Sequence, residues 1–192
     1  MPAQSAAQIW PDHVAATLDD GQVALLRPLH AGEREPVLDV FAGMSDLSRA
    51  RRYLTGMPYL PDRVLQRLTE VGHRDHVAWL ATIDGEPVGI GRYAAYDHRT
   101  VDVALEVVDH WHGHGLGGIL LDTVATLASA NGFSAVAATV DPANHASVRL
   151  LRRVGLTLQV LDGVLEGQGA LRLPDPARID RCAVLGVVAE AQ

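Results

Sequence analysis

The sequence predicts a single domain of the α/β (α+β) class, in which helices flank a central mixed sheet. The chain has 192 residues, of which 48% are hydrophobic, and this is enough to build one sizeable core. From residue 76 onward, extended and helical patterns follow one another in the order β-β-β-α-β-α-β. No internal repeat or low-complexity linker interrupts them. A mixed sheet with packed helices is therefore the expected architecture.

The first 75 residues are predicted to contribute one strand and two or three amphipathic helices. Residues 1–20 are polar and rich in Ala, and we expect a flexible leader there. A strand is expected at Gln22–Leu29. The helices are expected at Ala31–Met44, Ser45–Leu54 and Pro61–Val71, with Ser45 as an N-cap and Pro61 near a first turn.

The remaining residues are predicted to complete the sheet. The strands are expected at His76–Ile83, Val88–Tyr96, Thr100–Val108, Ser134–Val140 and Leu156–Leu161, the first two forming a hairpin. The helices are expected at Leu116–Ala130 and Asn144–Val154, ended by Gly132 and Gly155. The domain is predicted to span residues 21–173. Residues 174–192 are predicted to be a tail, and a final strand in that region, at about Cys182–Ala189, is one alternative.

Charge and cysteine content exclude several classes of protein. The formal net charge is −7, which disfavours a protein that grips nucleic acid through clustered Lys and Arg. Cys182 is the only cysteine, so no internal disulfide can form and a structural zinc site is not expected. No signal-like N-terminus and no run of about 18 apolar residues is present. We therefore expect a cytoplasmic protein that does not enter membranes.

A strand, a glycine-rich loop and a helix follow one another between Val107 and Leu121. Glycines let the backbone approach an anion, and the first N–H groups of a helix have no internal acceptor and lie at the positive end of its dipole. This segment therefore predicts a phosphate site, although a tight turn alone would also explain the glycines. It lacks the Gly-Lys-Ser/Thr of nucleotide P-loops, and it does not open a βαβ dinucleotide unit.

Two motifs in this region resemble the GNAT superfamily of N-acetyltransferases. His112-Gly113-His114-Gly115-Leu116-Gly117 is similar to the family's Gln/Arg-x-x-Gly-x-Gly/Ala loop, with His112 at the Gln/Arg position. Asn144-x-x-Ser147-x-x-Leu150-Leu151-x-x-x-Gly155-Leu156 is similar to the helix that packs beside the cofactor. The resemblance covers about residues 22–161. It implies a mostly antiparallel mixed sheet with two splayed central strands, acetyl-CoA as cosubstrate, and direct attack by an amine in a ternary complex.

The N-terminal half is more specifically similar to bacterial protein-lysine acetyltransferases. The stretches that carry this likeness are Leu26–Leu29, Ser48–Tyr53 and Leu68–His76. The acceptor amine is therefore a protein lysine or a small molecule, and the sequence does not choose between them. Dimers are common in the family, and the apolar end of the chain is one candidate interface.

The resemblance implies a set of cofactor contacts. The N–H of Val107 is expected to polarise the acetyl carbonyl, and the glycine loop to hold the pyrophosphate. The predicted cofactor-binding residues are Val107, Val108, His112, Gly113, His114, Gly115, Leu116, Gly117, Gly118, Asn144 and Ser147. One of Arg149, Arg152 and Arg153 could reach the 3′-phosphate, although such a basic run is usually a solvated helix face.

Two acids on the strand before the loop are candidates for the base that deprotonates the amine. An ammonium with a pKa near 10 must lose a proton before it attacks. Asp102 and Glu106 are four residues apart and so face the same side of the strand. Asp102 stands where similar lysine acetyltransferases carry a Glu base. The alternative is that either acid lines a wet cleft or pairs with Arg92 or Arg99.

Two features depart from the family pattern. The Tyr that often serves as general acid is replaced by Leu151, so the departing thiolate would take its proton from water, or Ser147 could donate a hydrogen bond to it instead. This loss, with His112 at the Gln/Arg position, supports an alternative in which the protein is a non-catalytic acyl-CoA sensor. The alternating His110, His112 and His114 lack a further spaced ligand, so no metal site is expected.

Overall fold

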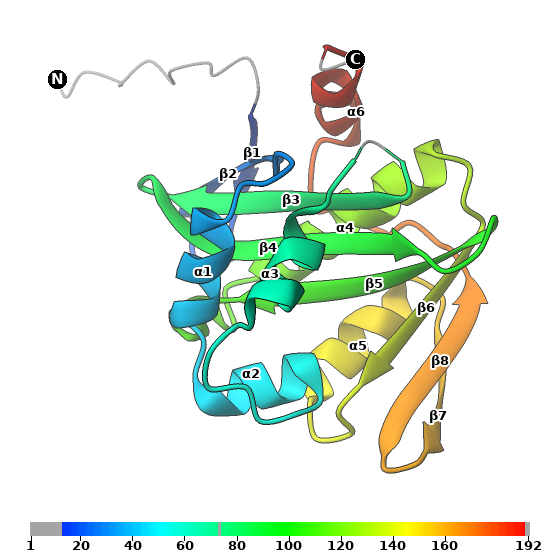
Figure 1. Ribbon diagram of the computed structural model, residues 1–192. Helices are drawn as coiled ribbons and strands as arrows, with labels where there is room; N and C mark the ends of the chain where they lie inside the picture. Colours follow the sequence, from blue (N-terminus) through cyan, green and yellow to red (C-terminus); the bar gives the residue numbers. More distant parts are fainter. Residues whose placement is uncertain (1–12, 73, 191–192) are drawn as a thin grey trace, which may run out of the picture.

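The computed structural model describes residues 13–72 and 74–190. Within them, eight strands form one sheet in the order β1-β2-β3-β4-β5-β6-β8-β7 (Figure 1). The strands are β1 (Val14–Thr17), β2 (Val23–Pro28), β3 (His76–Ile83), β4 (Glu86–Ala95), β5 (Thr100–Val107), β6 (Ala135–Val140), β7 (Thr157–Leu161) and β8 (Val164–Ala170). None of the described helices is long and apolar enough to cross a membrane.

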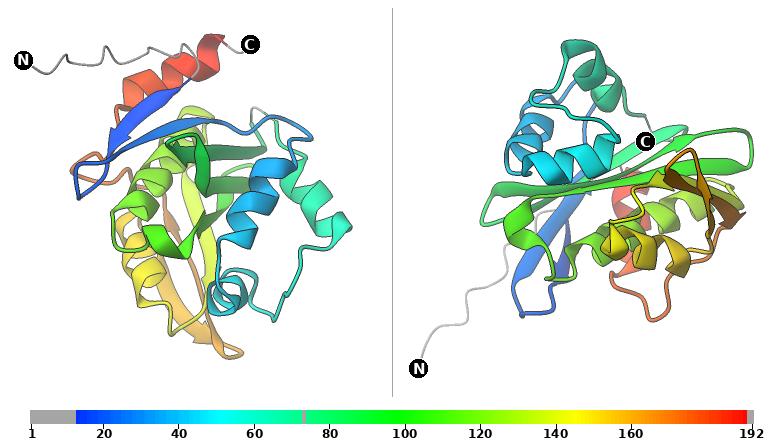
Figure 2. Two further views of the ribbon diagram at one scale, coloured as in Figure 1. Left: turned by 90° about the vertical axis from the view of Figure 1, so that its left-hand side faces the viewer. Right: turned by 90° about the horizontal axis from the view of Figure 1, so that it is seen from below.

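Helices cover both faces of the sheet, as the two views in Figure 2 show. α1 (Glu35–Ala42), α2 (Asp46–Tyr53) and α3 (Asp62–Thr69) lie on one face. α4 (Leu116–Ala130) and α5 (His145–Arg153) lie on the other, and α6 (Arg181–Glu190) packs against α4 and β1. Two apolar cores result, because successive strand residues point to opposite faces. Leu80 and Ile90 face α1 and α3, whereas Trp79 and Val101 join the core around α4.

The sheet opens between β5 and β6. Its other strand pairs are antiparallel, whereas β5 and β6 run parallel and pair only from Thr100↔Ala135 to Asp102↔Ala137. Beyond this point β5 continues to Val107 and β6 continues to Val140, but the two strands no longer pair with each other. This confirms the mixed, mostly antiparallel sheet with a splayed central pair.

α4 lies close to β4 because glycines in that strand carry no side chain. A Cβ on Gly91 would lie 3.0 Å from the Leu120 carbonyl oxygen and 3.1 Å from the Leu120 Cβ. Twelve consecutive or near-consecutive residues of α4, from Leu116 to Ala128, are buried, so the helix is packed on most of its surface. The helix that presents the glycine loop is therefore held rigidly in the core.

Two predictions about the ends of the chain are wrong. β1 lies inside the expected leader, since Val14 and Ala16 are buried and β1 pairs with β2; the rest of the prediction, for residues 1–12, falls outside the described residues. The final strand that is one alternative for Cys182–Ala189 is instead the helix α6, and the Asp180 side chain caps its start by accepting a hydrogen bond from the Ala183 N–H at 3.1 Å. A short apolar run does not distinguish a buried helix from a strand.

The C-terminal segment is anchored to α4 through Asp122, whose side chain is fully buried. Asp122 accepts hydrogen bonds from the backbone N–H of Arg178 at 2.6 Å and from the Arg181 Nε at 2.8 Å. Charged partners make such bonds stronger than neutral ones. Residues 178–181 are thereby tied to the helix that carries the glycine loop.

Asp122→Asn is expected to lower the free energy of unfolding by about 2 kcal/mol, since it removes the charge that pairs with Arg181. It also replaces one of the two acceptor oxygens by an NH2 group, which would face a donor, either the Arg178 N–H or the Arg181 side chain. Urea denaturation measures the loss. Asp162→Asn, at the exposed turn between β7 and β8, is the control and should change stability little. Equal stability of both variants would show that Asp122 does not anchor the segment.

Candidate active site

A cavity of about 610 Å³ lies where β5 and β6 separate, between α2, α5 and the start of α4. It brings together most of the predicted cofactor-binding residues. Those that line it are Val107, His112, Gly113, Gly115, Leu116, Gly117, Gly118, Asn144 and Ser147. Val108 and His114 do not line it.

The glycine loop leaves backbone donors free at the start of α4. Gly115 is the N-cap in the left-handed conformation, with φ of 87°, and no side chain caps the helix. The N–H groups of Gly118 and Ile119 both donate to the Gly115 carbonyl. In the described part of the chain, the N–H groups of Leu116 and Gly117 have no acceptor. These two donors, at the positive end of the helix dipole, suit an anion.

The strand edge that faces the cavity lies beyond the pairing of β5 with β6, which ends at Asp102. The Val108 N–H donates to the Val88 carbonyl at 3.0 Å, so it belongs to the β4 side of β5 and cannot serve a ligand. Successive amides of a strand point to opposite edges, so the Val107 N–H points toward the open side next to β6. His112 donates from Nε2 to the Val107 carbonyl at 3.0 Å, which ties the loop to the strand end.

His114 turns away from the cavity, toward the turn between β1 and β2. Its Nδ1 lies 3.0 Å from the His112 carbonyl oxygen, and its Nε2 lies 3.6 Å from a carboxylate oxygen of Asp20. Its ring also packs against Trp111. Among residues 13–72 and 74–190, no three His, Cys, Asp or Glu side chains come close enough together to hold a metal ion.

The start of α5 forms the opposite wall of the cavity. The Asn144 side chain accepts a hydrogen bond from the Ser147 N–H at 3.2 Å and so caps the helix. Leu151, at the position where the family often carries Tyr, is buried in the core. It supplies no hydroxyl. Arg149 and Arg153 also line the cavity, while Arg152 does not.

Glu106 is buried on the face of β5 that α2 covers, and it is surrounded by cations. Its carboxylate accepts hydrogen bonds from the Tyr53 hydroxyl at 2.9 Å and from Arg92 at 3.1 Å, and the Nε of Arg52 lies 3.3 Å away. Burial by itself would raise the pKa of Glu106, but the charges of Arg92 and Arg52 outweigh it, so the pKa is lowered. A carboxylate paired in this way is a weak proton acceptor.

Tyr53, Arg52 and Arg92 were not identified as a cluster by sequence reasoning. Burial and the neighbouring charge of Glu106 raise the pKa of Tyr53, which keeps its hydroxyl a hydrogen-bond donor. From the sequence, Arg92 is only one possible partner of the two acids. Tyr53 and Glu106 are 53 positions apart in sequence, and Arg92 and Glu106 are 14 apart, so no local pattern could reveal the cluster.

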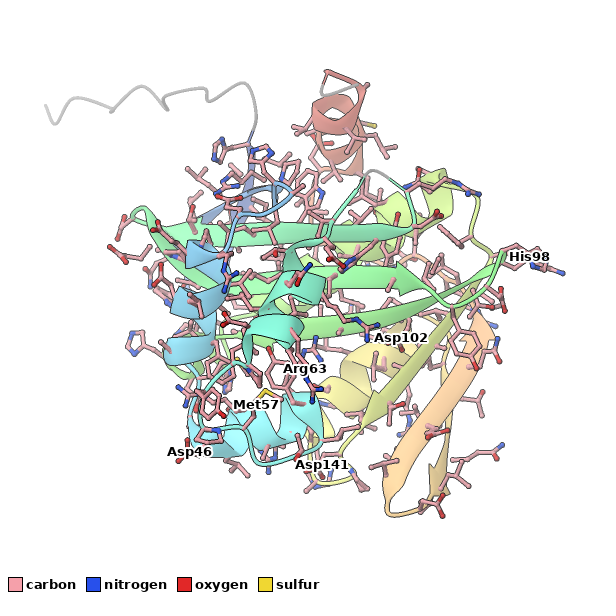
Figure 3. All side chains as sticks on the ribbon, viewed as in Figure 1. Asp46, Met57, Arg63, His98, Asp102 and Asp141 are labelled. Carbon is pink, nitrogen blue, oxygen red and sulfur yellow. The ribbon has the colours of Figure 1, made fainter. Side chains whose placement is uncertain are left out.

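Asp102 lies on the same face of β5 as Glu106 and is exposed (Figure 3). Its carboxylate makes no hydrogen bond or ion pair within the described residues. Partial loss of hydration raises its pKa, and the charge of Arg52 opposes this rise. Arg52 itself lines the cavity. Asp102 does not itself line the cavity, but the next two residues of β5, Val103 and Ala104, do. Its carboxylate has no protein partner among the described residues, whereas that of Glu106 is occupied.

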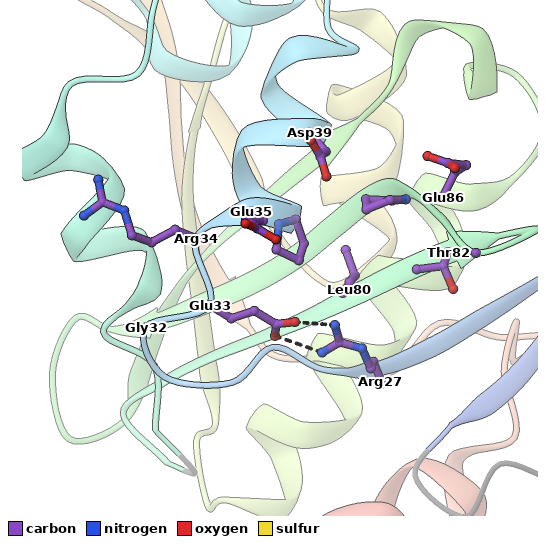
Figure 4. A pocket seen from close by; sticks show the side chains of 12 residues that line it. Arg27, Gly32, Glu33, Arg34, Glu35, Asp39, Leu80, Thr82 and Glu86 are labelled. Atoms are coloured by element: carbon purple, nitrogen blue, oxygen red, sulfur yellow. Dashed lines mark hydrogen bonds and ion pairs between the residues drawn. The ribbon is translucent and has the colours of Figure 1, made fainter.

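A second cavity, of about 710 Å³, lies between α1 and the β3–β4 hairpin (Figure 4). Arg27 and Glu33, which line it, form a two-pronged ion pair with distances of 2.9 and 2.5 Å. The hydrogen bonds from Arg27 lower the pKa of Glu33, with burial opposing this effect. None of the residues predicted for the site lines this cavity, so its size does not indicate the catalytic centre.

Comparisons with known proteins identify the family and the fold. A model of the acetyltransferase (GNAT) family matches residues 42–156. Acetyltransferase PA5475 of Pseudomonas aeruginosa is 30% identical over 158 residues, which are 80% of this chain and 85% of that protein. The crystal structure of the GNAT domain of S. lividans PAT has a TM-score of 0.76 and 27% identity, and covers 88% of this chain and 100% of its own.

A GNAT superfamily phosphinothricin acetyltransferase from Sinorhizobium meliloti, solved with AcCoA, has a TM-score of 0.60 and 18% identity, over 82% of this chain and 93% of that one. This likeness shows the fold alone. Fold and cavity together define a domain of the GNAT type. The chain belongs to the acetyltransferase (GNAT) family.

Proposed function

We propose that the protein transfers an acetyl group from acetyl-CoA to a primary amine, by direct attack in a ternary complex. The observation that carries this proposal is the combination of free amides at the start of α4 with an unpaired carboxylate on Asp102, the neighbour in β5 of Val103, which lines the same cavity. The first feature suits the diphosphate of the cosubstrate. The second suits deprotonation of an ammonium.

The residues present fit acetyl-CoA. The Leu116 and Gly117 N–H groups would hold the pyrophosphate, with Gly113 and Gly115 letting it approach closely. Arg149 and Arg153 line the cavity from α5 and are suited to a further phosphate. When bound, acetyl-CoA supplies the acetyl thioester. The Val107 N–H is the donor we assign to the acetyl carbonyl.

Asp102 is the residue to which we assign removal of the ammonium proton. The pKa of Asp102 is raised, so it lies closer to the pKa of the ammonium than the pKa of an ordinary Asp does. No ion pair competes for the Asp102 carboxylate oxygens. Glu106 is assigned a positioning role, because it holds Tyr53 and Arg52 against the sheet. Leu151 offers no proton, so the thiolate formed would be protonated by water.

The acceptor class remains a protein lysine or a small-molecule amine. The likeness of residues 26–29, 48–53 and 68–76 to bacterial protein-lysine acetyltransferases favours a lysine. Thiol release measured over a panel of amines and lysine-containing proteins tests the assignment. If acetyl groups are transferred to free amines and to no protein, the acceptor is a small-molecule amine.

A non-catalytic acyl-CoA sensor is the second candidate, supported by Leu151 and His112 at positions where the family carries other residues. A sensor has no use for a base beside the thioester, so Asp102 favours the enzyme. Binding of acetyl-CoA without acetylation of any member of the panel would favour the sensor.

Acetyl-CoA is expected to raise the Tm of the protein, because a ligand that binds only the folded state at about 100 times its Kd adds about 2.7 kcal/mol of stability. Gly117→Val should abolish this increase, since the branched side chain would crowd the free amides and Leu150, whose Cδ1 already lies 3.2 Å from a Cβ at this position. Differential scanning fluorimetry measures both effects.

Gly118→Ala is the matched control for this experiment. A Cβ on Gly118 would meet only Leu150, at an ordinary 3.8 Å, and the Gly118 N–H is already bonded to Gly115. This variant should keep the full increase in Tm. If Gly117→Val also keeps it, the pyrophosphate does not bind at the start of α4.

A further inference from the structure

An ion pair from two distant parts of the chain lies directly against the glycine loop. Arg178, between β8 and α6, donates to a carboxylate oxygen of Asp19, in the turn between β1 and β2, at 2.6 Å. A Cβ on Gly115 would lie 2.7 Å from the other Asp19 carboxylate oxygen and would also collide with the Arg178 guanidinium. Both residues lie outside the segment that matches the GNAT family model.

The backbones of both residues are held in place. The Arg178 N–H donates to the buried Asp122 at 2.6 Å, and the Asp19 N–H donates to the His114 carbonyl at 3.0 Å. Their side chains are nevertheless accessible: the Arg178 side chain is 27% exposed and that of Asp19 is 53% exposed. The side chains can therefore exchange partners without moving the segments that carry them.

The charges make such an exchange favourable. Asp19 lines the cavity, so its carboxylate lies at the end of α4 where the free amides of Leu116 and Gly117 attract an anion. A diphosphate there would be repelled by Asp19 and attracted by Arg178. A guanidinium group can bind phosphate oxygens through two parallel hydrogen bonds. Arg178 makes only one hydrogen bond to the Asp19 carboxylate.

We propose that Arg178 is a ligand of the acetyl-CoA pyrophosphate, and that Asp19 is its partner only in the free protein. This inference rests on the proposed function. It makes the C-terminal segment, through the Asp122 anchor, a part of the cofactor site, and it makes Asp19 a competitor that weakens cofactor binding.

Calorimetric titration of the full-length protein with acetyl-CoA tests the proposal. Arg178→Gln should raise the Kd for acetyl-CoA about 10-fold or more, because a hydrogen bond between charged groups is lost. Asp19→Asn should lower the Kd for acetyl-CoA several-fold, because the carboxylate that competes for Arg178 is gone. Arg172→Gln, an exposed arginine of the same segment, is the matched control and should leave the Kd unchanged.

Titration with S-acetyl-pantetheine, which lacks the diphosphate, separates a phosphate contact from a general weakening. The Arg178→Gln variant should bind this probe as the parent does. If the parent binds acetyl-CoA but Arg178→Gln and Asp19→Asn both leave its Kd unchanged and only lower the Tm, the ion pair is structural and the inference is overturned. If the parent does not bind acetyl-CoA, the proposed function itself fails.

Discussion

Asp102→Asn is expected to lower kcat/KM for amine acetylation by about 100-fold or more at neutral pH, with acetyl-CoA affinity near that of the parent. The amide keeps the size and the hydrogen-bonding capacity of the carboxylate but accepts no proton. Asp102 is exposed and has no protein partner among the described residues, so its replacement should not disturb the fold. Steady-state kinetics and calorimetric binding measure the two quantities separately.

The pH dependence of this defect follows from the direction of the pKa shift. The pKa of Asp102 is raised above its ordinary 3.8, so its basic form is lost at a higher pH than for an Asp with the ordinary pKa, and the acidic limb of the parent's pH profile should reflect this. Free amine becomes abundant as the pH approaches 10. The deficit of the Asn variant should therefore shrink in alkaline buffer. If Asp102→Asn has the same kcat/KM as the parent at every pH from about 6 to 9, water or another group removes the proton.

Local patterns predicted the element types well in the middle of the chain. The helix at Leu116–Ala130 has the predicted bounds, because Gly115 and Gly132 both adopt positive φ at its ends. Ser45 caps α2 as predicted, accepting a hydrogen bond from the Ser48 N–H. Where a single residue type determines the backbone conformation, the sequence carries the information locally.

The ends of the chain were harder to predict, because tertiary contacts decide their structure. Val14 and Ala16 form a strand by pairing with β2, and Val184 is buried in α6 against the α4 layer. Neither segment has a strong period of its own. The Arg178–Asp19 pair joins residues 159 positions apart, so it was invisible to any reasoning from spacing.

The candidate site was predicted in part for the same reason. The glycine loop and the common face of Asp102 and Glu106 follow from local spacing, and the structure has both. Which of the two acids is free depends on α2, whose Tyr53 and Arg52 contact Glu106 only in the folded chain. The sequence alone leaves both acids as candidates for the base, and their different surroundings support the proposal that Asp102 is the base.

Glu106→Gln is expected to reduce stability, in contrast to Asp102→Asn. It would leave Arg92, which is 4% exposed, and the half-buried Arg52 without their counter-charge, and breaking a buried pair in this way costs about 3–5 kcal/mol. For a chain of this size, each kcal/mol corresponds to about 2–4 °C, so the Tm should fall by roughly 6–20 °C. Thermal denaturation followed by circular dichroism measures this fall.

The difference between Glu106→Gln and the parent should depend on pH. Because the pKa of Glu106 is lowered on folding, its contribution to stability is fully present above its unfolded value near 4.5 and is lost as the pH falls through the lower folded value. The two proteins should thus converge in stability in strong acid. Tyr53→Phe, which removes one hydrogen bond of 2.9 Å and no charge, is the matched control and should cost only about 1–2 kcal/mol at neutral pH. A Glu106→Gln protein as stable as the parent but unable to acetylate would reverse the assignment, making Glu106 the base and Asp102 a bystander in the cleft.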